Sequence, residues 1–262
     1  MSQFKLTTIA MVVTSTLAAG ELTAAEQTRF YDVSATNSVT QGASLAAVQQ
    51  KTLAERATVS GQKSIYDAQM GKATFLWQAI GQRKPDMALI AADNRNQYAA
   101  DFYIEALTGI SNRKATASSA VMVDLSEQKR GSISAKYKQQ VNGVEVFNRE
   151  YNLLMDKEYN LVASSGYFAD TSSSKNKLAA LTGFVSSEQS IKKAFSELAN
   201  IDVSLRKIGN EGGYAKYEAK SLDDSKIVLG TPRAKEVFFE VAGELKSAYY
   251  IEVEVAEVGS LE

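Results

Sequence analysis

Hydrophobic and polar residues alternate along residues 132–141. The apolar parity holds Ile133, Ala135, Tyr137 and Val141. A period of two is typical of a strand with one face in a core and the other in water. Asn142 and Gly143 come next, and this pair readily supplies the two positive-φ residues of a tight type I′ turn. The pattern therefore predicts a strand followed by a β-hairpin turn.

A second apolar run follows the turn and changes phase part of the way along. It begins with Val144 and Val146 and continues with Phe147, Tyr151, Leu153 and Met155. A change of phase within one strand indicates a β-bulge, which we expect near residues 148–150. After a polar turn at residues 156–160, alternation resumes at Tyr159, Leu161, Ala163 and Tyr167. With a short strand at residues 120–125 in front, the pattern predicts an antiparallel meander.

Helical periodicity marks three further segments. Residues 94–107 place Tyr98, Phe102 and Ala106 on one face, beside Ala99, Tyr103 and Leu107. Gly109 follows as a helix stop. Residues 187–199 carry apolar side chains at i, i+3, i+4 and i+7, with Ser187 as the expected cap. Residues 44–59 show a looser version of the same spacing.

Strand-like segments follow the helix at residues 187–199. They are residues 203–208, 214–219, 227–229, 236–242 and 245–258. The Gly-rich run at residues 209–213 lacks the Lys-Ser/Thr pair of a phosphate loop and leads into a strand, so we interpret it as a hairpin turn. Residues 70–77 form a small apolar cluster around the sole tryptophan, Trp77, which we expect to be a core anchor.

Composition limits the chemistry that this chain can perform. Its 262 residues are 45% hydrophobic and 23% charged, and its net charge of −1 comes from interspersed acids and bases, a pattern that does not suggest binding to nucleic acid. Because the chain has no cysteine and no histidine, the usual zinc ligand sets and a Ser-His-Asp or Cys-His site cannot be built from it. We interpret the acid pairs Asp223-Asp224 and Glu252/Glu254 as solvated. We therefore assign no catalytic residue, metal ligand or cofactor site to this chain.

The first 25 residues have the pattern of a secretory signal. Lys5 supplies a positive n-region, residues 6–19 are uncharged and mostly apolar, and Thr23 and Ala25 stand at −3 and −1 of a cleavage site. The run is too short for a comfortable membrane span of roughly twenty residues. A buried N-terminal helix is the alternative interpretation. We expect cleavage after Ala25, with Ala19 and Ala24 as alternative sites.

The predicted signal has consequences for localisation. We expect a secreted, extracellular protein that passes through the periplasm if the cell is Gram-negative. Once the signal is removed, we expect no association with a membrane.

Residues 137–168 also resemble the fungalysin/thermolysin propeptide module, which stands at the front of secreted zinc metalloproteases. The family pattern is an aromatic residue with nearby glutamines, an N-G-V/I-x-V-F turn, an apolar strand and a strand that ends in S-G. In this chain these features are Tyr137, Gln139 and Gln140, residues 142–147, residues 153–155, and Ser165-Gly166. Residues 70–77 are similar to the G-x-P-T-F-x-W segment ahead of that module, with Ala73 in place of the proline.

The C-terminal part looks like the PepSY-type half of the same proregions, a helix followed by strands that end in A-Y-Y-I-E-V-E-V. We therefore predict four parts, and the polar, Ser-rich residues 170–177 form the boundary before the fourth. They are a signal peptide (1–25), a helical N-terminal segment (26–110), the antiparallel meander (111–175) and a PepSY-like helix with antiparallel strands (178–258). The predicted fold class is α+β, with antiparallel sheets each packed against helices in two propeptide-like subdomains.

The resemblance implies a non-catalytic proregion that helps a protease domain to fold and keeps it inhibited until the proregion is cut away. The implied partner is the metalloprotease catalytic domain, in cis if the gene continues past Glu262, and zinc is implied for that domain alone. Lys136, Lys138 and Gln140, on the polar parity of the first meander strand, are the candidates for contacting it.

Two alternative functions stay open at this point. The first is a stand-alone secreted inhibitor or chaperone of a separately encoded protease. The second is a cell-envelope module that binds a peptide or a small ligand.

Overall fold

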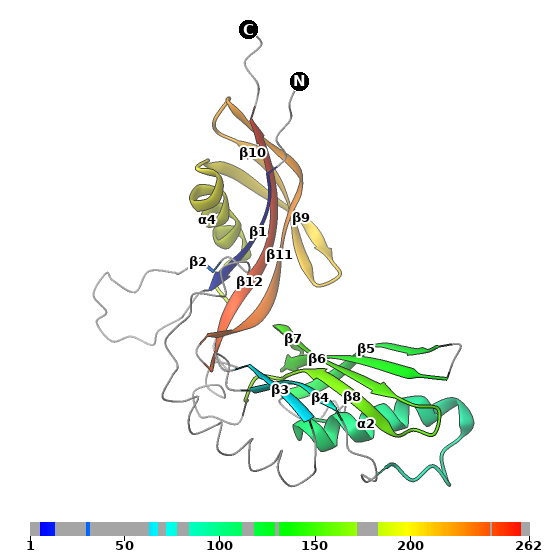
Figure 1. The fold of residues 1–262 in the computed structure, drawn as a ribbon. Helices are drawn as coiled ribbons and strands as arrows, with labels where there is room; N and C mark the ends of the chain where they lie inside the picture. The colour runs from blue at the N-terminus through cyan, green and yellow to red at the C-terminus, as the bar shows by residue number, and fades with distance from the viewer. Residues whose placement is uncertain are drawn as a thin grey trace. The chain divides into compact units, whose positions relative to one another are not determined.

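The structure is a computed structural model of the chain. It describes residues 6–13, 30–31, 63–67, 72–77, 84–111, 118–128, 131–171, 183–241 and 243–257. The chain divides into two compact units (Figure 1). Unit 1 contains residues 1–38 and 172–262, and unit 2 contains residues 39–171. The division at residue 172 falls inside the Ser-rich segment 170–177.

Unit 2 is built on one antiparallel sheet. Its strands follow the order β5–β6–β7–β8–β4–β3, so sequence neighbours pair in the middle and the two earliest strands are added at one edge. The strands are β3 (Lys63–Asp67), β4 (Lys72–Trp77), β5 (Ser118–Glu127), β6 (Ile133–Val141), β7 (Val144–Met155) and β8 (Leu161–Gly166).

The β6–β7 hairpin follows the alternation of the sequence. Buried and half-buried residues alternate along the whole of β6. Asn142 and Gly143 form the two-residue turn, with φ of 50° and 82°, and Val141 pairs with Val144 across it. The predicted bulge is confirmed, because the β6–β7 register shifts opposite residues 146–149 and Asn148 takes a φ of 58°.

One helix, α2 (Arg95–Thr108), covers one face of the unit 2 sheet (Figure 1). It follows a short 3-10 turn, η2 (Ala92–Asn94), and ends as predicted at Gly109, whose N–H donates to the carbonyl of Glu105. Its small side chains let it approach the sheet closely. The core between helix and sheet includes Ala99, Ala100, Tyr103, Ile104, Ile133, Ala135, Tyr137, Leu153 and Met155.

Unit 1 is built on a second antiparallel sheet, in the order β2–β1–β12–β11–β10–β9. Residues 212–213 form the β9–β10 turn, with φ of 58° and 83°, which confirms the hairpin interpretation of the Gly-rich run. The strands are β1 (Leu6–Val13), β2 (Phe30–Tyr31), β9 (Val203–Glu211), β10 (Tyr214–Ser221), β11 (Lys226–Val241) and β12 (Glu244–Glu257).

The helix of unit 1, α4 (Ser187–Ala199), has the bounds that the periodicity predicts. Its apolar stripe, with Ile191 and Phe195 fully buried, packs on one face of the sheet (Figure 1). The predicted cap is wrong, because Ser186 is the N-cap residue and the Ser187 hydroxyl lies 2.7 Å from the Tyr217 hydroxyl instead. The sheet supplies Val203, Tyr217, Ala234, Tyr249, Ile251, Val253 and Val255 to this core.

The predicted fold class, α+β with antiparallel sheets each packed against helices, is wrong, because strands dominate and each sheet meets a single described helix. The described residues are mostly β-sheet, and they contain two α-helices of 14 and 13 residues against twelve strands. Two features lengthen the sheets beyond the prediction. Residues 63–67 and 72–77, inside the segment expected to be helical, are strands, and residues 226–241 form one strand where two short ones were predicted.

The long strand β11 has a physical explanation. Gly230 and Pro232 are residue types that usually end a strand, but β11 continues through them with a register shift between Leu229 and Arg233. Gly230 takes a φ of 64° there, which a glycine adopts without strain.

Two expectations about burial are also wrong. Trp77 was expected in the core, yet its side chain is 51% exposed. On α2 the buried stripe runs through Ala99, Tyr103 and Ile104, and Tyr98 is exposed. The predicted helix at residues 44–59, the cleavage site at Ala25 and most of the linker 170–177 lie outside the described residues.

Candidate partner-binding surface

The sheet of unit 2 has a second face, turned away from α2, which we call the open face. Leu153 and Met155 point into the core under α2, so Asn152 and Leu154 between them point to the open face. Cross-strand pairs show that the open face continues from β7 onto β8 and β4. Leu154 pairs with Ala163 of β8, and Ala163 pairs with Trp77 of β4. Phe75 lies two residues before Trp77, on the same face, and pairs with Ile65 of β3.

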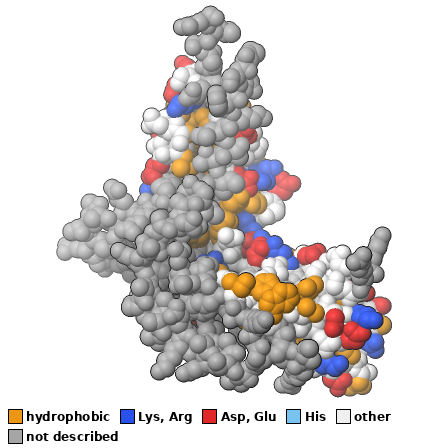
Figure 2. Space-filling view, viewed as in Figure 1, with side chains coloured by type: hydrophobic (Ala, Val, Ile, Leu, Met, Phe, Trp, Pro, Cys, Tyr) orange, Lys and Arg blue, Asp and Glu red, His pale blue; other side chains and the backbone are white. Residues whose placement is uncertain are grey.

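Large apolar side chains stand exposed on this face. Ile65 is 62%, Trp77 51% and Leu154 38% exposed, and the Phe75 ring meets the Trp77 ring edge-on with centroids 5.1 Å apart. Figure 2 shows an apolar patch on the surface of unit 2. Single exposed hydrophobic residues are ordinary, but a cluster that includes a tryptophan is typical of an interaction site. We call Ile65, Phe75, Trp77 and Leu154 the open-face patch.

Charged residues border the patch on the same face. Lys136 pairs across the sheet with Asn152, and its amine lies 2.5 Å from a carboxylate oxygen of Glu150. The Lys138 amine lies 2.8 Å from Glu145 and 3.7 Å from Glu150. Burial lowers the pKa of Lys138, but its hydrogen bond to Glu145 and the nearby Glu145 and Glu150 charges leave the pKa raised overall.

The residues predicted to face a partner therefore lie on the open face. Lys136, Lys138 and Gln140 share its polar side, and both lysines are engaged by glutamates of β7. Because these ion pairs are partly exposed to water, each adds little stability. An apolar centre beside a polar border is the usual anatomy of a protein–protein interface.

The S-G ending of the third meander strand has a packing reason. Gly166 has a φ of 94°, and a Cβ at this position would lie 2.1 Å from the carbonyl oxygen of Glu150. The β7 backbone can approach β8 this closely only where the side chain is absent. Gly166 thus holds the strand that carries Glu150 in place, next to the charged border of the open-face patch.

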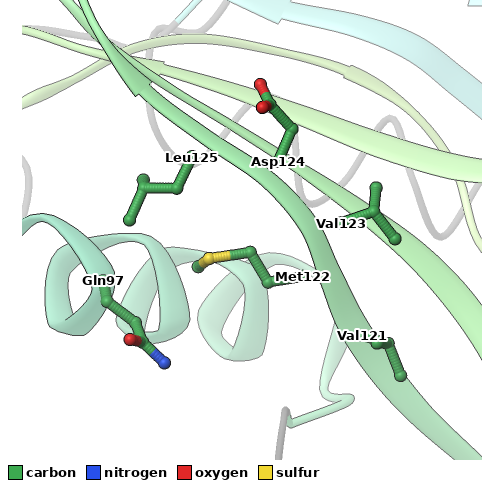
Figure 3. A pocket seen from close by; sticks show the side chains of 6 residues that line it. All are labelled: Gln97, Val121, Met122, Val123, Asp124 and Leu125. Carbon is green, nitrogen blue, oxygen red and sulfur yellow. The ribbon is translucent and has the colours of Figure 1, made fainter.

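A second feature of unit 2 is a hollow of about 360 Å³ between α2 and β5 (Figure 3). Met122 and Leu125 point toward the helix, while Asp124 points away from it. Both apolar residues reach the same side because the β5–β6 register shifts between Met122 and Asp124. β5 is the edge strand of this sheet. Gln97, Val121, Met122, Val123, Asp124 and Leu125 line the hollow.

The acidic residues of the described ranges form no reactive cluster. No group of three or more metal-ligating side chains occurs among these residues. Asp223 accepts hydrogen bonds from the Ser225 hydroxyl and backbone N–H, and these bonds lower its pKa. Glu252 accepts from the guanidinium of Arg233. Both carboxylates are therefore engaged in local contacts.

Sequence reasoning found the charged border but missed the open-face patch. The pairings of β4 with β8 and of β8 with β7 place Trp77 and Leu154 on either side of Ala163, and they join segments more than seventy residues apart. The available signal was Phe75 and Trp77 at a spacing of two, which is the period of a strand face. Nothing local indicated that no described helix covers this face.

Comparisons with known proteins give little further guidance. No protein-family profile matches the chain. No curated protein matches it either. Among solved structures, the C-terminal domain of Bacillus megaterium YpeB is weakly similar, with a TM-score of 0.29 and 10% identity over 78% of this chain and 95% of that one. The resemblance to fungalysin-type propeptides thus depends on the motif residues alone.

The hydropathy of the helices is also informative. Within the described ranges, neither helix is long and apolar enough to cross a membrane.

Proposed function

We propose that this chain is the non-catalytic proregion of a secreted fungalysin-type zinc metalloprotease, acting as intramolecular chaperone and inhibitor of its catalytic domain. The observation that supports this proposal best is the open-face patch. A tryptophan and two aliphatic residues are exposed, and a half-buried phenylalanine packs against the tryptophan, beside a border of ion pairs on the module that carries the propeptide motif. Such a surface serves to cover another protein rather than to transform a substrate.

The physical basis of the two roles is the same contact. A partner that binds the folded protease stabilises it by mass action and offers a template to a domain that folds slowly. An interface of ordinary size, roughly 1,600 Å² in total, is sufficient to block a cleft. Zinc would be bound by the protease alone, because this chain has no histidine or cysteine to hold it.

Export and activation follow from the same proposal. The signal at residues 1–25 would direct the chain out of the cell, where a protease and its inhibitor can be kept together until a cut separates them. Polar connecting segments such as residues 170–177 are suitable places for that cut.

The test mixes the processed chain, residues 26–262, with the mature catalytic domain of the zinc metalloprotease encoded downstream of it or nearest to it in the genome. We expect slower peptide hydrolysis and a higher yield of active protease on refolding. Leu154→Glu should remove the inhibition, because it places a charge in the open-face patch. Leu222→Glu is the matched control, since Leu222 is an exposed leucine of unit 1 and should tolerate the change. Unchanged hydrolysis and recovery with the wild-type chain would contradict the proposal.

The same surface suits a stand-alone inhibitor or chaperone of a separately encoded protease. Reading the gene past the codon for Glu262 distinguishes the two, because the proregion requires an H-E-x-x-H domain downstream.

A peptide-binding module is the second candidate, and the hollow between α2 and β5 favours it. An edge strand beside a helix is a known arrangement for adding an extended peptide to a sheet. A peptide retained by the purified chain, seen by native mass spectrometry and lost in Met122→Glu, would favour this function over the first.

A further inference from the structure

The strand β1 pairs along residues 248–255 of β12, at the edge of β12 that does not pair with β11. Eight consecutive residues of each strand pair, from Leu6 with Val255 to Val13 with Ala248. Backbone pairing of this length uses the N–H and C=O groups of residues 248–255 that point to that side of β12. This edge of β12, the acceptor edge, can therefore pair with an extended segment, and β1 shows the register and direction in which one pairs.

The segment in this acceptor is the apolar part of the predicted secretory signal. Leu6–Val13 lies within the uncharged run at residues 6–19. Cleavage after Ala25 would therefore remove a paired strand and open the edge of β12. A long strand with an unpaired edge readily pairs with another chain.

A helix lies beside the acceptor edge. Tyr249, Ile251, Val253 and Val255 of β12 are buried under α4, and the backbone of α4 also lies near β1. A segment that adds to β12 is thus bounded by a sheet edge on one side and by a helix above it. The part of β1 that pairs with β12 indicates which segments this edge accepts, because it consists of eight uncharged and largely apolar residues.

We propose that the outer edge of β12 is a strand-acceptor site, filled by the signal segment before processing and by an uncharged extended segment of the protease afterwards. The second half of this statement rests on the proposed function. Strand addition would give the complex a directional, backbone-based contact in unit 1 that differs in kind from the side-chain patch of unit 2.

A second copy of this chain is a poor occupant. Antiparallel self-pairing of β12 centred on residues 251–253 would place Glu252 opposite or diagonal to Glu252 or Glu254 of the other copy. Like charges at such positions destabilise a sheet. The protease segment meets no such repulsion if it is as uncharged as Leu6–Val13.

The experiment uses the chain as it is secreted, with its N-terminus read by mass spectrometry, and a fluorescent peptide of residues 5–14 as the probe. Two versions of the peptide carry N-methyl groups, one at Thr7, Ile9 and Met11 and the other at Thr8, Ala10 and Val12. Because alternate amides of a strand point to opposite sides, only one set faces β12. The two versions have the same number of methyl groups, so each controls for the other.

We expect the unmethylated peptide and one methylated version to bind the processed chain, and the other version to bind at least tenfold more weakly. The unprocessed chain should bind none of them. A secreted chain that retains residues 6–13, no binding, or equal binding of both methylated versions would overturn the proposal. If the processed chain is unfolded, recovery of its circular dichroism with the peptide supports the proposal, and failure to recover contradicts it.

Hydrogen exchange with the protease separates this proposal from the proposed function. Slower exchange at residues 248–255 in the complex, and competition by the peptide, are expected. Inhibition without either effect would overturn the acceptor site and leave the proposed function standing. Peptide binding with no inhibition by the chain would leave the acceptor edge standing, but it would overturn the proposed function and with it the protease as the occupant.

Discussion

The two units have the same arrangement of sheet and helix, but they differ in the side chains on the sheet face that no described helix covers. Each has an antiparallel sheet with one helix on one side, so each leaves a face of the sheet without a described helix. In unit 1 polar contacts occupy the part of this face around Arg233, while Ile227 is exposed farther along β11. Arg233 lies over the Tyr214 ring at 4.6 Å and pairs with Glu252 at 2.6 Å, and Tyr214 meets Tyr250 at 6.2 Å.

In unit 2 the corresponding face exposes the open-face patch. Charge pairs are present there too, but they stand beside the apolar residues and do not cover them. Polar side chains that bond to one another are stable in contact with water, whereas covering exposed apolar and aromatic side chains with a partner lowers the free energy. The difference points to unit 2 as the side-chain interface of the molecule.

The largest predicted effect concerns the core of unit 1. Phe195→Ala should lower the free energy of unfolding by about 3–5 kcal/mol, because it leaves a cavity under a fully buried ring between α4 and the sheet. Urea unfolding measures the loss. Ser196→Ala, one residue along on the exposed side of α4, should change it by less than about 0.5 kcal/mol. Equal effects would mean that α4 does not pack as described.

The next effect compares two glycines of unit 2. Gly166→Ala should cost roughly 3 kcal/mol, since its Cβ would meet the Glu150 carbonyl oxygen and its φ is positive. Gly143→Ala should cost only about 1 kcal/mol, because its φ is also positive but the space around it is open. Thermal or urea unfolding of both variants decides the ranking, and a reversed order would refute the close approach of β7 to β8.

Buried tyrosines predict a loss of stability at alkaline pH in both units. Burial and the hydrogen bond to Asp101 raise the pKa of Tyr137, and burial and the nearby Glu236 raise the pKa of Tyr249. Both folded pKa values lie above the unfolded value of about 10, so this stability is present below pH ~10 and is lost as pH rises above it.

The pH prediction is measured by urea unfolding between pH 9 and pH 11. Tyr137→Phe should flatten the fall above pH 10 by up to about 1.4 kcal/mol per pH unit, the contribution of one proton. A fall as steep as that of the wild type would show that Tyr137 ionises in the folded protein.

The smallest predicted effect concerns the charged border. Lys138→Met should change the free energy of unfolding by less than about 1 kcal/mol, because its ion pairs with Glu145 and Glu150 are partly exposed and screened. Salt titration of the wild type and the variant measures the pair directly. A larger loss would assign the border a structural role in unit 2 rather than a place at the rim of an interface.

The sequence predicts the local elements of both units well, for reasons that are themselves local. The alternation of residues 132–141 predicts β6, the Asn-Gly pair predicts its turn, and four apolar positions predict the bounds of α4. Each of these signals lies within about a dozen residues. The polar parity of β6 likewise places Lys136 and Lys138 on one face.

The extent of the sheets was not predictable in this way. The pairings of β4 with β8 and of β1 with β12 join distant segments, and no short-range pattern encodes them. The same holds for the exposure of Trp77, which depends on how distant described segments pack around it. A tryptophan in a strand is usually buried, so the prediction followed the common case.

The account as a whole depends on the open-face patch becoming covered by a partner. The chain contains one tryptophan, Trp77, so 5-fluorotryptophan places a single ¹⁹F label at the centre of the patch. The test adds the unlabelled protease catalytic domain and records the ¹⁹F resonance and its shift between H₂O and D₂O. We predict that the resonance moves and that its solvent isotope shift falls as the protease becomes inhibited. A protease that is fully inhibited while this resonance stays unchanged would contradict the account.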